Sequence, residues 1–257
     1  MDNPSVYISL SQMKKNEIIY GIRAIIEALE ARKPINKIYL QKGLSGDLFK
    51  ELEFILRKNK ITVSYVPIER LNRFTSNNHQ GAVASISPVD YWNFEELAEK
   101  VLNEKEHPLL LLLDQISDVR NFGAIIRTAE CTGVDAIIIP KTGSAPINSD
   151  TIKTSAGAAF NVPIAKVDHL KDAIYYLKAS EVQIIAANEK SKNTLFEANL
   201  TKRCAIIMGS EDKGITDSIL KLSDYQAKLP ISGKIGSLNV SVACGVFLYE
   251  VVRQRLN

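Results

Sequence analysis

The sequence contains few cysteines, and none of them is spaced as a metal ligand or a disulfide partner. Cys131, Cys204 and Cys244 stand singly inside apolar segments, and no Cys-x-x-Cys pair occurs. This pattern argues against a disulfide framework or a cysteine-bound zinc site, and it is typical of buried thiols in a reducing compartment. We therefore predict neither a metal ion nor a disulfide.

The chain also lacks long apolar runs. The run PLLLLL before Asp114 is the longest uncharged apolar stretch near the middle of the chain, far short of the roughly 20 residues of a transmembrane helix. The N-terminal residues MDNPSVYISL do not combine a basic region with an apolar one, as a secretion signal does. We expect a soluble protein located in the cytoplasm.

Two nucleotide-binding motifs are missing as well. No two glycines stand two residues apart, so the GxGxxG fingerprint is absent, which argues against a dinucleotide-binding Rossmann enzyme. The segment GSEDKGIT from Gly209 has the glycine spacing of a phosphate-binding P-loop, but Ile215 stands where that loop requires lysine. Glu211 and Asp212 inside it would repel a triphosphate, which excludes a kinase or an ATPase.

The length and composition of the chain are those of a globular protein large enough for two domains. The 257 residues are 46% hydrophobic and 24% charged, with a net charge of +3. The charge is uneven, because residues 1–88 carry 13 basic against 8 acidic side chains, whereas residues 89–106 carry 2 against 6. The basic N-terminal third could meet phosphates, and a solvated basic surface explains the same excess.

The apolar pattern divides the chain into two α/β units. Residues 1–88 alternate helix-like and strand-like segments, with helices at 21–31 and 47–59 and strands at 36–42, 61–67 and 80–87. The acidic segment 89–106 is predicted to be a linker that contains a helix capped by Asn93.

Residues 107–257 form the second unit. Its strand-like apolar runs are residues 109–114, 135–140, 162–167, 182–188 and 204–209. One helix is expected to start after Asn121, and a long one to span residues 240–254. Uninterrupted apolar strands that alternate with helices predict a parallel sheet covered on both faces, in which ligands bind at the carboxyl ends of the strands.

Three polar segments fall at these strand ends or just beyond them. They are DVRNFGAIIRTAECTG from Asp118, IMGSEDKGI from Ile207 and LPISGKIGSLNVSVA from Leu229. A core strand that feeds an ordinary loop does not need Asn, Arg, Glu and Ser at such tight spacing. The three segments together therefore indicate the site of an enzyme.

In this order the segments resemble the three motifs of the SpoU/TrmH branch of the SPOUT class. The segment SAGAAFNVPI, residues 155–164, fits the same family between its first and second motifs. YGIRAIIEAL and HQGAVASISP resemble the small RNA-binding domain, similar to a ribosomal protein fold, of the 23S rRNA guanosine methyltransferases in this group. The resemblance covers nearly the whole chain. It implies S-adenosylmethionine-dependent 2'-O-methylation of a ribose in RNA, with a guanosine of 23S rRNA as the first candidate.

The fold implied by the resemblance is an α/β SPOUT domain with a deep trefoil knot, preceded by the small α/β RNA-binding domain. The knot loops would hold the cofactor in a bent conformation. Gly209, Gly214, Gly233 and Gly236 would permit close backbone approach there, and simple turn glycines explain each of them equally. The implied cofactor-binding residues are Ile207, Met208, Gly209, Gly214, Leu229, Pro230, Ile231, Ser237 and Leu238.

The same resemblance implies a set of catalytic residues, namely Asn121, Arg127, Glu211, Ser237 and Asn239. Arg127 matches the family's catalytic arginine, for which a general-base role has been proposed. A guanidinium is not readily deprotonated, so we expect it to anchor the RNA phosphate and to stabilise developing alkoxide character. The group that accepts the proton is left open.

Structural roles compete with several of these assignments. Asn121 and Arg127 are six residues apart, about 240° around a helix, so they converge only if Asn121 acts from the helix cap. Asn121 could equally be a plain N-cap, and Arg127 a surface arginine. Glu211, expected to orient the nucleotide or the loop, could cap a helix, and Ser237 and Asn239 could both cap the final helix.

Three positions depart from the family pattern. Val119 replaces a common proline, Phe122 stands beside Gly123 in the predicted loop, and Asp212 occupies a frequent glycine position. These departures concern the shape of the loops and the affinity for the cofactor, and no matched catalytic side chain is lost.

The resemblance also bears on partners. Similar enzymes are homodimers that pack their knotted domains together, and the apolar helix 240–252 could contribute to such a surface, although core packing explains it equally. Two other functions stay open: an RNA-binding protein that kept the fold and lost catalysis, and a methyltransferase that acts on tRNA or confers antibiotic resistance through rRNA. The matched catalytic residues argue against the first, and the N-terminal domain favours rRNA.

Overall fold

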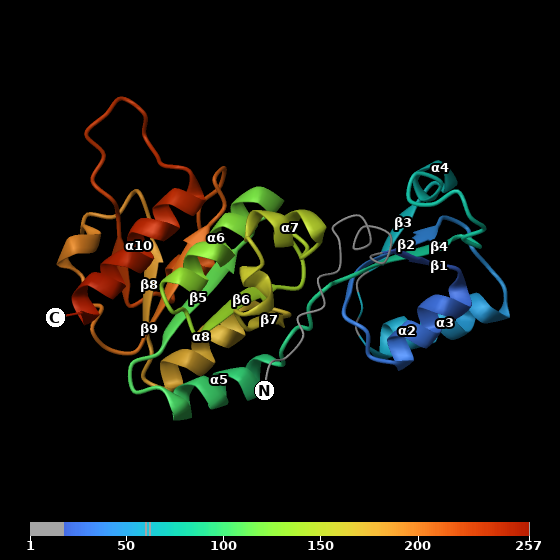
Figure 1. The fold of residues 1–257 in the computed structure, drawn as a ribbon, viewed down its shortest axis with the longest axis horizontal. Coiled ribbons are helices and arrows are strands. Elements are labelled where there is room, and N and C mark those ends of the chain that lie inside the picture. The colour runs from blue at the N-terminus through green and yellow to red at the C-terminus, as the bar shows by residue number, and fades with distance from the viewer. Residues whose placement is uncertain (1–17, 60, 62, 257) are drawn as a thin grey trace, which may run out of the picture. The chain divides into compact units, whose positions relative to one another are not determined.

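The structure, a computed structural model, describes residues 18–59, 61 and 63–256 (Figure 1). The described chain divides into two compact units with the boundary between Asp90 and Tyr91, and the short segment Ile147–Ser149 is grouped with the first unit. Each unit has a hydrophobic core of its own.

The first unit is a four-stranded sheet with two long helices on one face. Its elements are β1 (Ile18–Tyr20), α2 (Ile22–Glu30), β2 (Ile35–Gln41), α3 (Asp47–Lys58), β3 (Val63–Val66), α4 (Ile68–Leu71) and β4 (Ala82–Ile86). The strand order is β1-β4-β2-β3, in which only β2 and β3 are parallel. Ile25 of α2 and Leu52 of α3 are buried with Ile38 and Leu40 of β2, because the helical and alternating periods each bring one apolar face to this core.

The segment predicted to be a linker contributes to the second core. Residues Phe94–Glu104 form α5, and the side chain of Asn93 caps it by accepting a hydrogen bond from the backbone N–H of Glu96 at 3.1 Å, as expected. Leu97 and Val101 of this helix are buried in the core of the second unit. Most of this segment is therefore not a free linker, because the apolar side of α5 packs against the sheet of the second unit.

The second unit is built on a six-stranded parallel sheet. Its remaining elements are β5 (Leu109–Asp114), α6 (Val119–Cys131), β6 (Ala136–Pro140), α7 (Ser149–Thr154), β7 (Ile164–Val167), α8 (Leu170–Ala179), β8 (Gln183–Ala187), β9 (Cys204–Gly209), α9 (Asp217–Leu220), β10 (Tyr225–Ala227) and α10 (Val240–Arg255), with 3-10 turns at Ala158–Phe160 and Leu195–Glu197. The strand order is β10-β8-β9-β5-β6-β7, and every neighbouring pair is parallel. The predicted parallel sheet is thus confirmed.

Helices cover both faces of this sheet. On one face, α5 and α8 pack against Leu110, Leu112 and Ile207. On the other, α6 and α10 lie side by side, and α10 also contacts β9 (Figure 1). The short strand β10 was not predicted from the sequence, because its three residues carry no apolar run. Within the residues that the structure describes, no helix is long and apolar enough to cross a membrane.

Candidate active site

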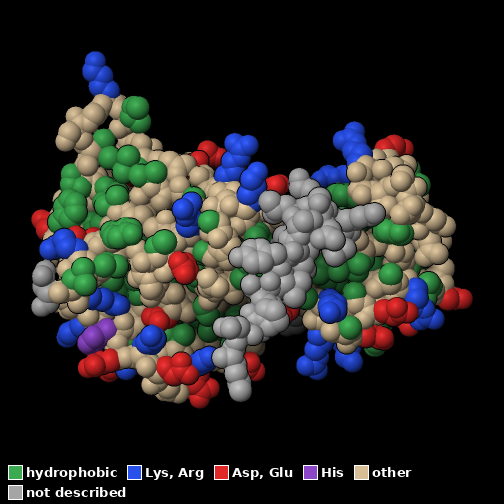
Figure 2. All heavy atoms as spheres, viewed as in Figure 1, with side chains coloured by type: hydrophobic (Ala, Val, Ile, Leu, Met, Phe, Trp, Pro, Cys, Tyr) green, Lys and Arg blue, Asp and Glu red, His purple; other side chains and the backbone are tan. Residues whose placement is uncertain are grey.

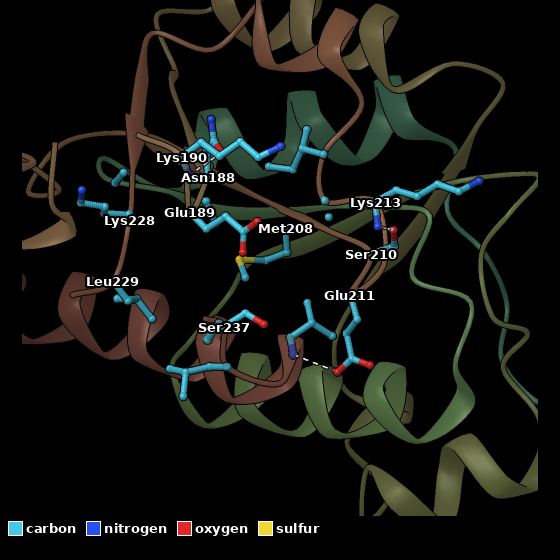
Figure 3. Close-up of a pocket in the computed structure, with 18 of the residues that line it drawn as sticks. Asn188, Glu189, Lys190, Met208, Ser210, Glu211, Lys213, Lys228, Leu229 and Ser237 are labelled. Carbon is cyan, nitrogen blue, oxygen red and sulfur yellow. Dashed lines mark hydrogen bonds between the residues drawn. The ribbon is translucent and has the colours of Figure 1, made fainter. Parts of the chain in front are cut away.

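A pocket of about 630 Å³ opens at the carboxyl ends of β8 and β9, beside the start of α10 (Figure 3). The residues that line it are Ala187, Asn188, Glu189, Lys190, Met208, Gly209, Ser210, Glu211, Asp212, Lys213, Gly214, Ile215, Asp217, Leu220, Ala227, Lys228, Leu229, Ile231, Gly236, Ser237, Leu238, Asn239, Val240, Ala243 and Phe247. Parallel α/β sheets bind ligands at this edge of the sheet, so the position agrees with the sequence-based expectation.

Most of the predicted cofactor-binding residues line this pocket. They are Met208, Gly209, Gly214, Leu229, Ile231, Ser237 and Leu238. Ile207 does not line it, because alternation along β9 turns its side chain into the core on the opposite side from that of Met208. Pro230 is not among the lining residues either.

The loop after β9 reverses tightly on itself. Ser210 and Gly214 exchange both backbone hydrogen bonds, with N···O distances of 3.1 and 2.9 Å. Gly214 has φ +68°, and a Cβ atom added to Gly209 would lie 2.2 Å from the carbonyl carbon of Gly214. Glycine is therefore required at Gly209 for this close backbone approach, and the reversal presents Glu211 and Asp212 at the rim of the pocket.

Three of the predicted catalytic residues meet at one point. The side-chain N–H₂ of Asn239 donates to Asn121 Oδ1 at 2.9 Å and also to Glu211 Oε1. Asn239 Oδ1 caps α10 by accepting from the backbone N–H of Ser241 at 3.0 Å. Glu211 Oε1 accepts a second bond from the N–H of Val240 at 3.2 Å, drawn as a dashed line in Figure 3. Glu211 and Asn239 thus accept hydrogen bonds from the first backbone N–H groups of α10. Asn121 links α6 to this end of α10 through its bond with Asn239.

The expected position of Asn121 at a helix cap is wrong. Helix α6 begins at Val119, and its cap is Asp118, whose Oδ1 accepts from the backbone N–H of Asn121 at 2.8 Å. Asn121 lies inside the first turn and still reaches Asn239, because α10 starts beside it. Phe122 does not lie in a loop, since it is within α6 and is buried.

Arg127 lies in the later part of α6 and stands apart from this cluster. Its side chain is exposed and forms no hydrogen bond or ion pair with another described residue. Arg127 and Asn121 are absent from the pocket lining, whereas Ser237 lines it, with its hydroxyl pointing into the pocket in Figure 3. The structure therefore leaves Arg127 free to contact a molecule from outside.

The pocket combines apolar walls with charged groups of both signs. Its acidic residues are Glu189, Glu211, Asp212 and Asp217, and its basic residues are Lys190, Lys213 and Lys228. Its large apolar side chains include Met208, Leu229, Ile231, Leu238 and Phe247. Such a site suits a small organic ligand that carries both an apolar ring and charged groups. Among the described residues, no group of three or more His, Cys, Asp or Glu side chains is placed to hold a metal ion.

Sequence reasoning missed one side of the pocket. Asn188, Glu189 and Lys190 follow β8 and face Ser237 and Glu211 across the pocket (Figure 3). The side chain of Asn188 donates to Gln226 Oε1 at 2.9 Å, which ties this strand end to the neighbouring β10. The sequence does indicate this side of the pocket, because the apolar run 182–188 ends in a polar residue at the same edge of the sheet as the other segments.

Family models match both units of the chain. The SpoU rRNA Methylase family matches residues 108–249, and a family described as RNA 2'-O ribose methyltransferase substrate binding matches residues 18–92.

Individual proteins match along most of the chain. The 23S rRNA (guanosine-2'-O-)-methyltransferase RlmB of Vibrio cholerae is 35% identical over 94% of this chain and 98% of its own length. An uncharacterized tRNA/rRNA methyltransferase of Synechocystis is 35% identical over 93% of this chain, which spans 63% of that relative's length. Among solved structures, an AdoMet-bound rRNA methyltransferase from Sinorhizobium meliloti shares the fold, with a TM-score of 0.61 at 22% identity over 97% of this chain and 92% of that one.

The first family model spans the parallel-sheet unit with its pocket and the Asn121–Glu211–Asn239 cluster, and the second spans the four-stranded sheet. The chain therefore belongs to the SpoU rRNA methylase family of RNA 2'-O-ribose methyltransferases.

Proposed function

We propose that the protein transfers the methyl group of S-adenosylmethionine to the 2'-hydroxyl of a guanosine in 23S rRNA. The observation that carries the proposal is the pocket at the ends of β8 and β9, at whose rim the side-chain amide of Asn239 donates hydrogen bonds to both Glu211 and Asn121. The choice of 23S rRNA and of guanosine rests on the relative from Vibrio cholerae and on the substrate-binding family of residues 18–92.

The residues of the pocket fit this cofactor. The pocket volume of about 630 Å³ lies within the range of roughly 300–1,000 Å³ that is common for small-molecule sites. Met208, Leu229 and Leu238 offer apolar surface to an adenine ring. Glu189 and Asp212 offer carboxylates to the positively charged part of the molecule. When bound, S-adenosylmethionine supplies an electrophilic methyl group on a positively charged sulfur.

The residues of this chain supply position and electrostatics. Glu211 Oε1 already accepts hydrogen bonds from Asn239 and Val240, so we assign Glu211 and Asn239 to holding the loop after β9 against α10 and Asn121. Ser237 offers its hydroxyl to substrate or cofactor. Arg127, exposed and without a protein partner among the described residues, anchors the RNA phosphate and stabilises negative charge as the 2'-oxygen forms its new bond.

The trefoil knot is part of the proposal. β10 pairs with β8 at one edge of the sheet, and the chain then returns through residues 228–239 to α10, which packs beside α6. The loop after β9 and this returning segment line the same pocket. Such a return across the sheet supports a knotted arrangement of the cofactor loops.

We also propose that the second units of two copies pack together through α10. Val242 and Tyr249 are 52% and 55% exposed and lie seven residues apart, which is close to two helical turns and brings them to one face. Figure 2 shows hydrophobic side chains gathered over α10 and the loop before it. The proposal also includes a substrate-binding domain at residues 1–88, a catalytic domain at residues 107–257, and action in the cytoplasm.

The test has two parts. Calorimetry with S-adenosylmethionine should give a saturable binding isotherm, and no binding at millimolar cofactor would overturn the enzymatic proposal. Ribose methylation is then mapped in RNA from cells with and without the gene, since a 2'-O-methyl group protects the adjacent phosphodiester bond from alkali. We expect one 23S rRNA guanosine to lose its methyl group. An unchanged 23S rRNA beside an undermethylated tRNA would overturn the rRNA assignment and leave the methyltransferase.

A further inference from the structure

The sheet of the first unit has a second face, away from α2 and α3. Side chains alternate along a strand, so Ile38 and Leu40 of β2 face the helices, whereas Lys37 and Tyr39 face the other side. Among the residues that the structure describes, α4 and those after it cover this second face, through a small cluster around Leu71. The described residues leave this face partly open, with Lys37 exposed on it.

Tyr39 organises the side chains on this face. Its ring lies 4.7 Å from the ring of Phe74, centroid to centroid. Lys37 Nζ lies 5.3 Å from the centroid of the same ring, and Arg70 Cζ lies 5.7 Å from it. Cations at these distances are attracted by the ring, which holds them near fixed positions without neutralising their charge. Arg73, exposed, directly precedes Phe74.

Acidic side chains are segregated to the opposite side of the unit. Between residues 18 and 88 the described chain has six acidic residues, and five of them lie on α2 or α3, namely Glu27, Glu30, Asp47, Glu51 and Glu53. Figure 2 accordingly shows most of the red side chains of this unit over these two helices. The sixth acidic residue, Glu69, directly precedes Arg70.

The cations of the two sides differ in their partners. Arg23, Lys50 and Arg57 on α2 and α3 form ion pairs with Glu51, Asp47 and Glu53, at N···O distances of 3.9, 3.1 and 3.1 Å. No ion pair joins Lys37, Arg70 or Arg73 to any residue that the structure describes. The positive charge of the open face is therefore available to an outside anion.

We propose that Lys37, Tyr39, Arg70 and Arg73, here called the Tyr39 patch, bind the sugar–phosphate backbone of the substrate RNA. Cations without a carboxylate partner release counterions from the RNA when they contact its phosphates, and a guanidinium group can bind two phosphate oxygens at once. The proposal rests on the proposed function, because that function makes RNA the polyanion this chain meets. It assigns the RNA contact to the open sheet face rather than to the helices, where Arg23, Lys50 and Arg57 already have carboxylate partners.

The test uses the full-length protein and a fluorescein-labelled RNA strand, whose anisotropy reports binding as the salt concentration is varied. The variant carries Lys37→Ala, Arg70→Ala and Arg73→Ala together. Each phosphate contact on a single strand contributes about 0.7 to the slope of log K against log salt, so the loss of three contacts should lower the slope by about 2. We expect the Kd to rise at least about tenfold at physiological salt.

The matched control carries Arg23→Ala, Lys50→Ala and Arg57→Ala, which remove the same charge from the α2 and α3 side. We expect its Kd to stay within about threefold of the unmodified protein. Equal losses in the two triple variants would show that only net charge matters and would overturn the proposal. Circular dichroism and calorimetry with S-adenosylmethionine verify that both variants are folded and keep the pocket.

Two outcomes separate this proposal from the function on which it rests. RNA binding by the unmodified protein, together with an unchanged Kd and salt slope in the Tyr39-patch variant, would overturn the patch alone. No RNA binding by the unmodified protein would overturn the RNA substrate as well. Tyr39→Phe keeps the ring and its neighbours and should bind RNA normally, whereas Tyr39→Leu removes the ring that holds both cations and should weaken binding severalfold.

Discussion

Asn121 Oδ1 accepts a hydrogen bond of 2.9 Å from the side-chain amide of Asn239, although the two residues are 118 positions apart in the chain. The bond joins the first turn of α6 to the cap of α10. Because Asn239 also donates to Glu211, one amide group connects residues from all three polar segments of the sequence. The proposed role of the cluster, which is to hold the loop after β9 in position, depends on this amide.

Two substitutions of Asn239 separate its role as the cap of α10 from its proposed role in positioning the loop after β9. Asn239→Ala removes both the cap of α10 and the amide donor, so the free energy of unfolding should fall by about 1 kcal/mol and methyl transfer should fall with it. Asn239→Ser keeps a capping oxygen, but its single, shorter O–H cannot donate to both Asn121 and Glu211 as the amide does. It should therefore keep nearly normal stability and lose at least tenfold in kcat/KM. Urea unfolding and initial rates measure the two effects, and normal kcat/KM in the Ser variant would contradict the positioning role.

Arg127 should contribute to catalysis without contributing to stability. It is exposed and has no polar partner among the described residues, so Arg127→Ala should change the free energy of unfolding by less than about 0.5 kcal/mol. If it stabilises charge that develops in the reaction, kcat/KM should fall by about a hundredfold or more. The Kd for S-adenosylmethionine should not change, because Arg127 does not line the pocket. Arg57→Ala, at an exposed arginine of α3, serves as the control and should be fully active.

The reversal after β9 should tolerate no side chain at Gly209. In Gly209→Ala the added Cβ would lie 2.2 Å from the carbonyl carbon of Gly214 and 2.3 Å from the N of Ile215, so the loop must move. We expect a loss of about 1–3 kcal/mol in unfolding free energy and weaker binding of S-adenosylmethionine. Gly233→Ala is the control, because no atom lies within 4 Å of its added Cβ. Equal cofactor affinities in both variants would show that the shape of this loop does not control binding.

The thiols should differ sharply in reactivity. Burial raises the pKa of Cys204 to about 11 and the pKa of Cys244 to about 12, whereas Cys131 is exposed. At pH 8 a thiol reagent should therefore label Cys131 rapidly and the other two only after unfolding. Rapid labelling of a second thiol in the folded protein would contradict the burial of Cys204 on β9 or of Cys244 on α10.

The same shifts give a pH dependence of stability. A folded pKa above the ordinary thiol value of 9.0 means that the unfolded chain releases its protons first as the pH rises. The contribution of Cys244 is therefore complete below pH 9.0 and is lost as the pH approaches about 12. Denaturant unfolding should show a steeper loss of stability above pH 9.0 in the unmodified protein than in Cys244→Ala.

Most elements were predictable because local patterns specify them. The five apolar runs of residues 107–257 are all strands of the parallel sheet, and the helix expected at residues 240–254 is α10. Strand β10 could not be predicted from its own three residues, because it is a strand only through its pairing with β8. Asn121 was placed at a cap because Asn is a good capping residue, but Asp118 takes that position three residues earlier.

By itself the sequence determined the parallel α/β class, the edge of the sheet where ligands bind and the family motifs, because these depend on the period of apolar residues and on short spacings. Only the tertiary structure decided that Asn121, Glu211 and Asn239 share hydrogen bonds while Arg127 stays exposed, and that Asn188, Glu189 and Lys190 complete the pocket. It also decided that Lys37 and Arg70, beside Tyr39, lack carboxylate partners among the described residues, while Arg23, Lys50 and Arg57 of α2 and α3 have them. The physical reason is the same in each case: hydrogen bonds and ion pairs act over a few ångströms, and which side chains come that close is set by packing between distant segments.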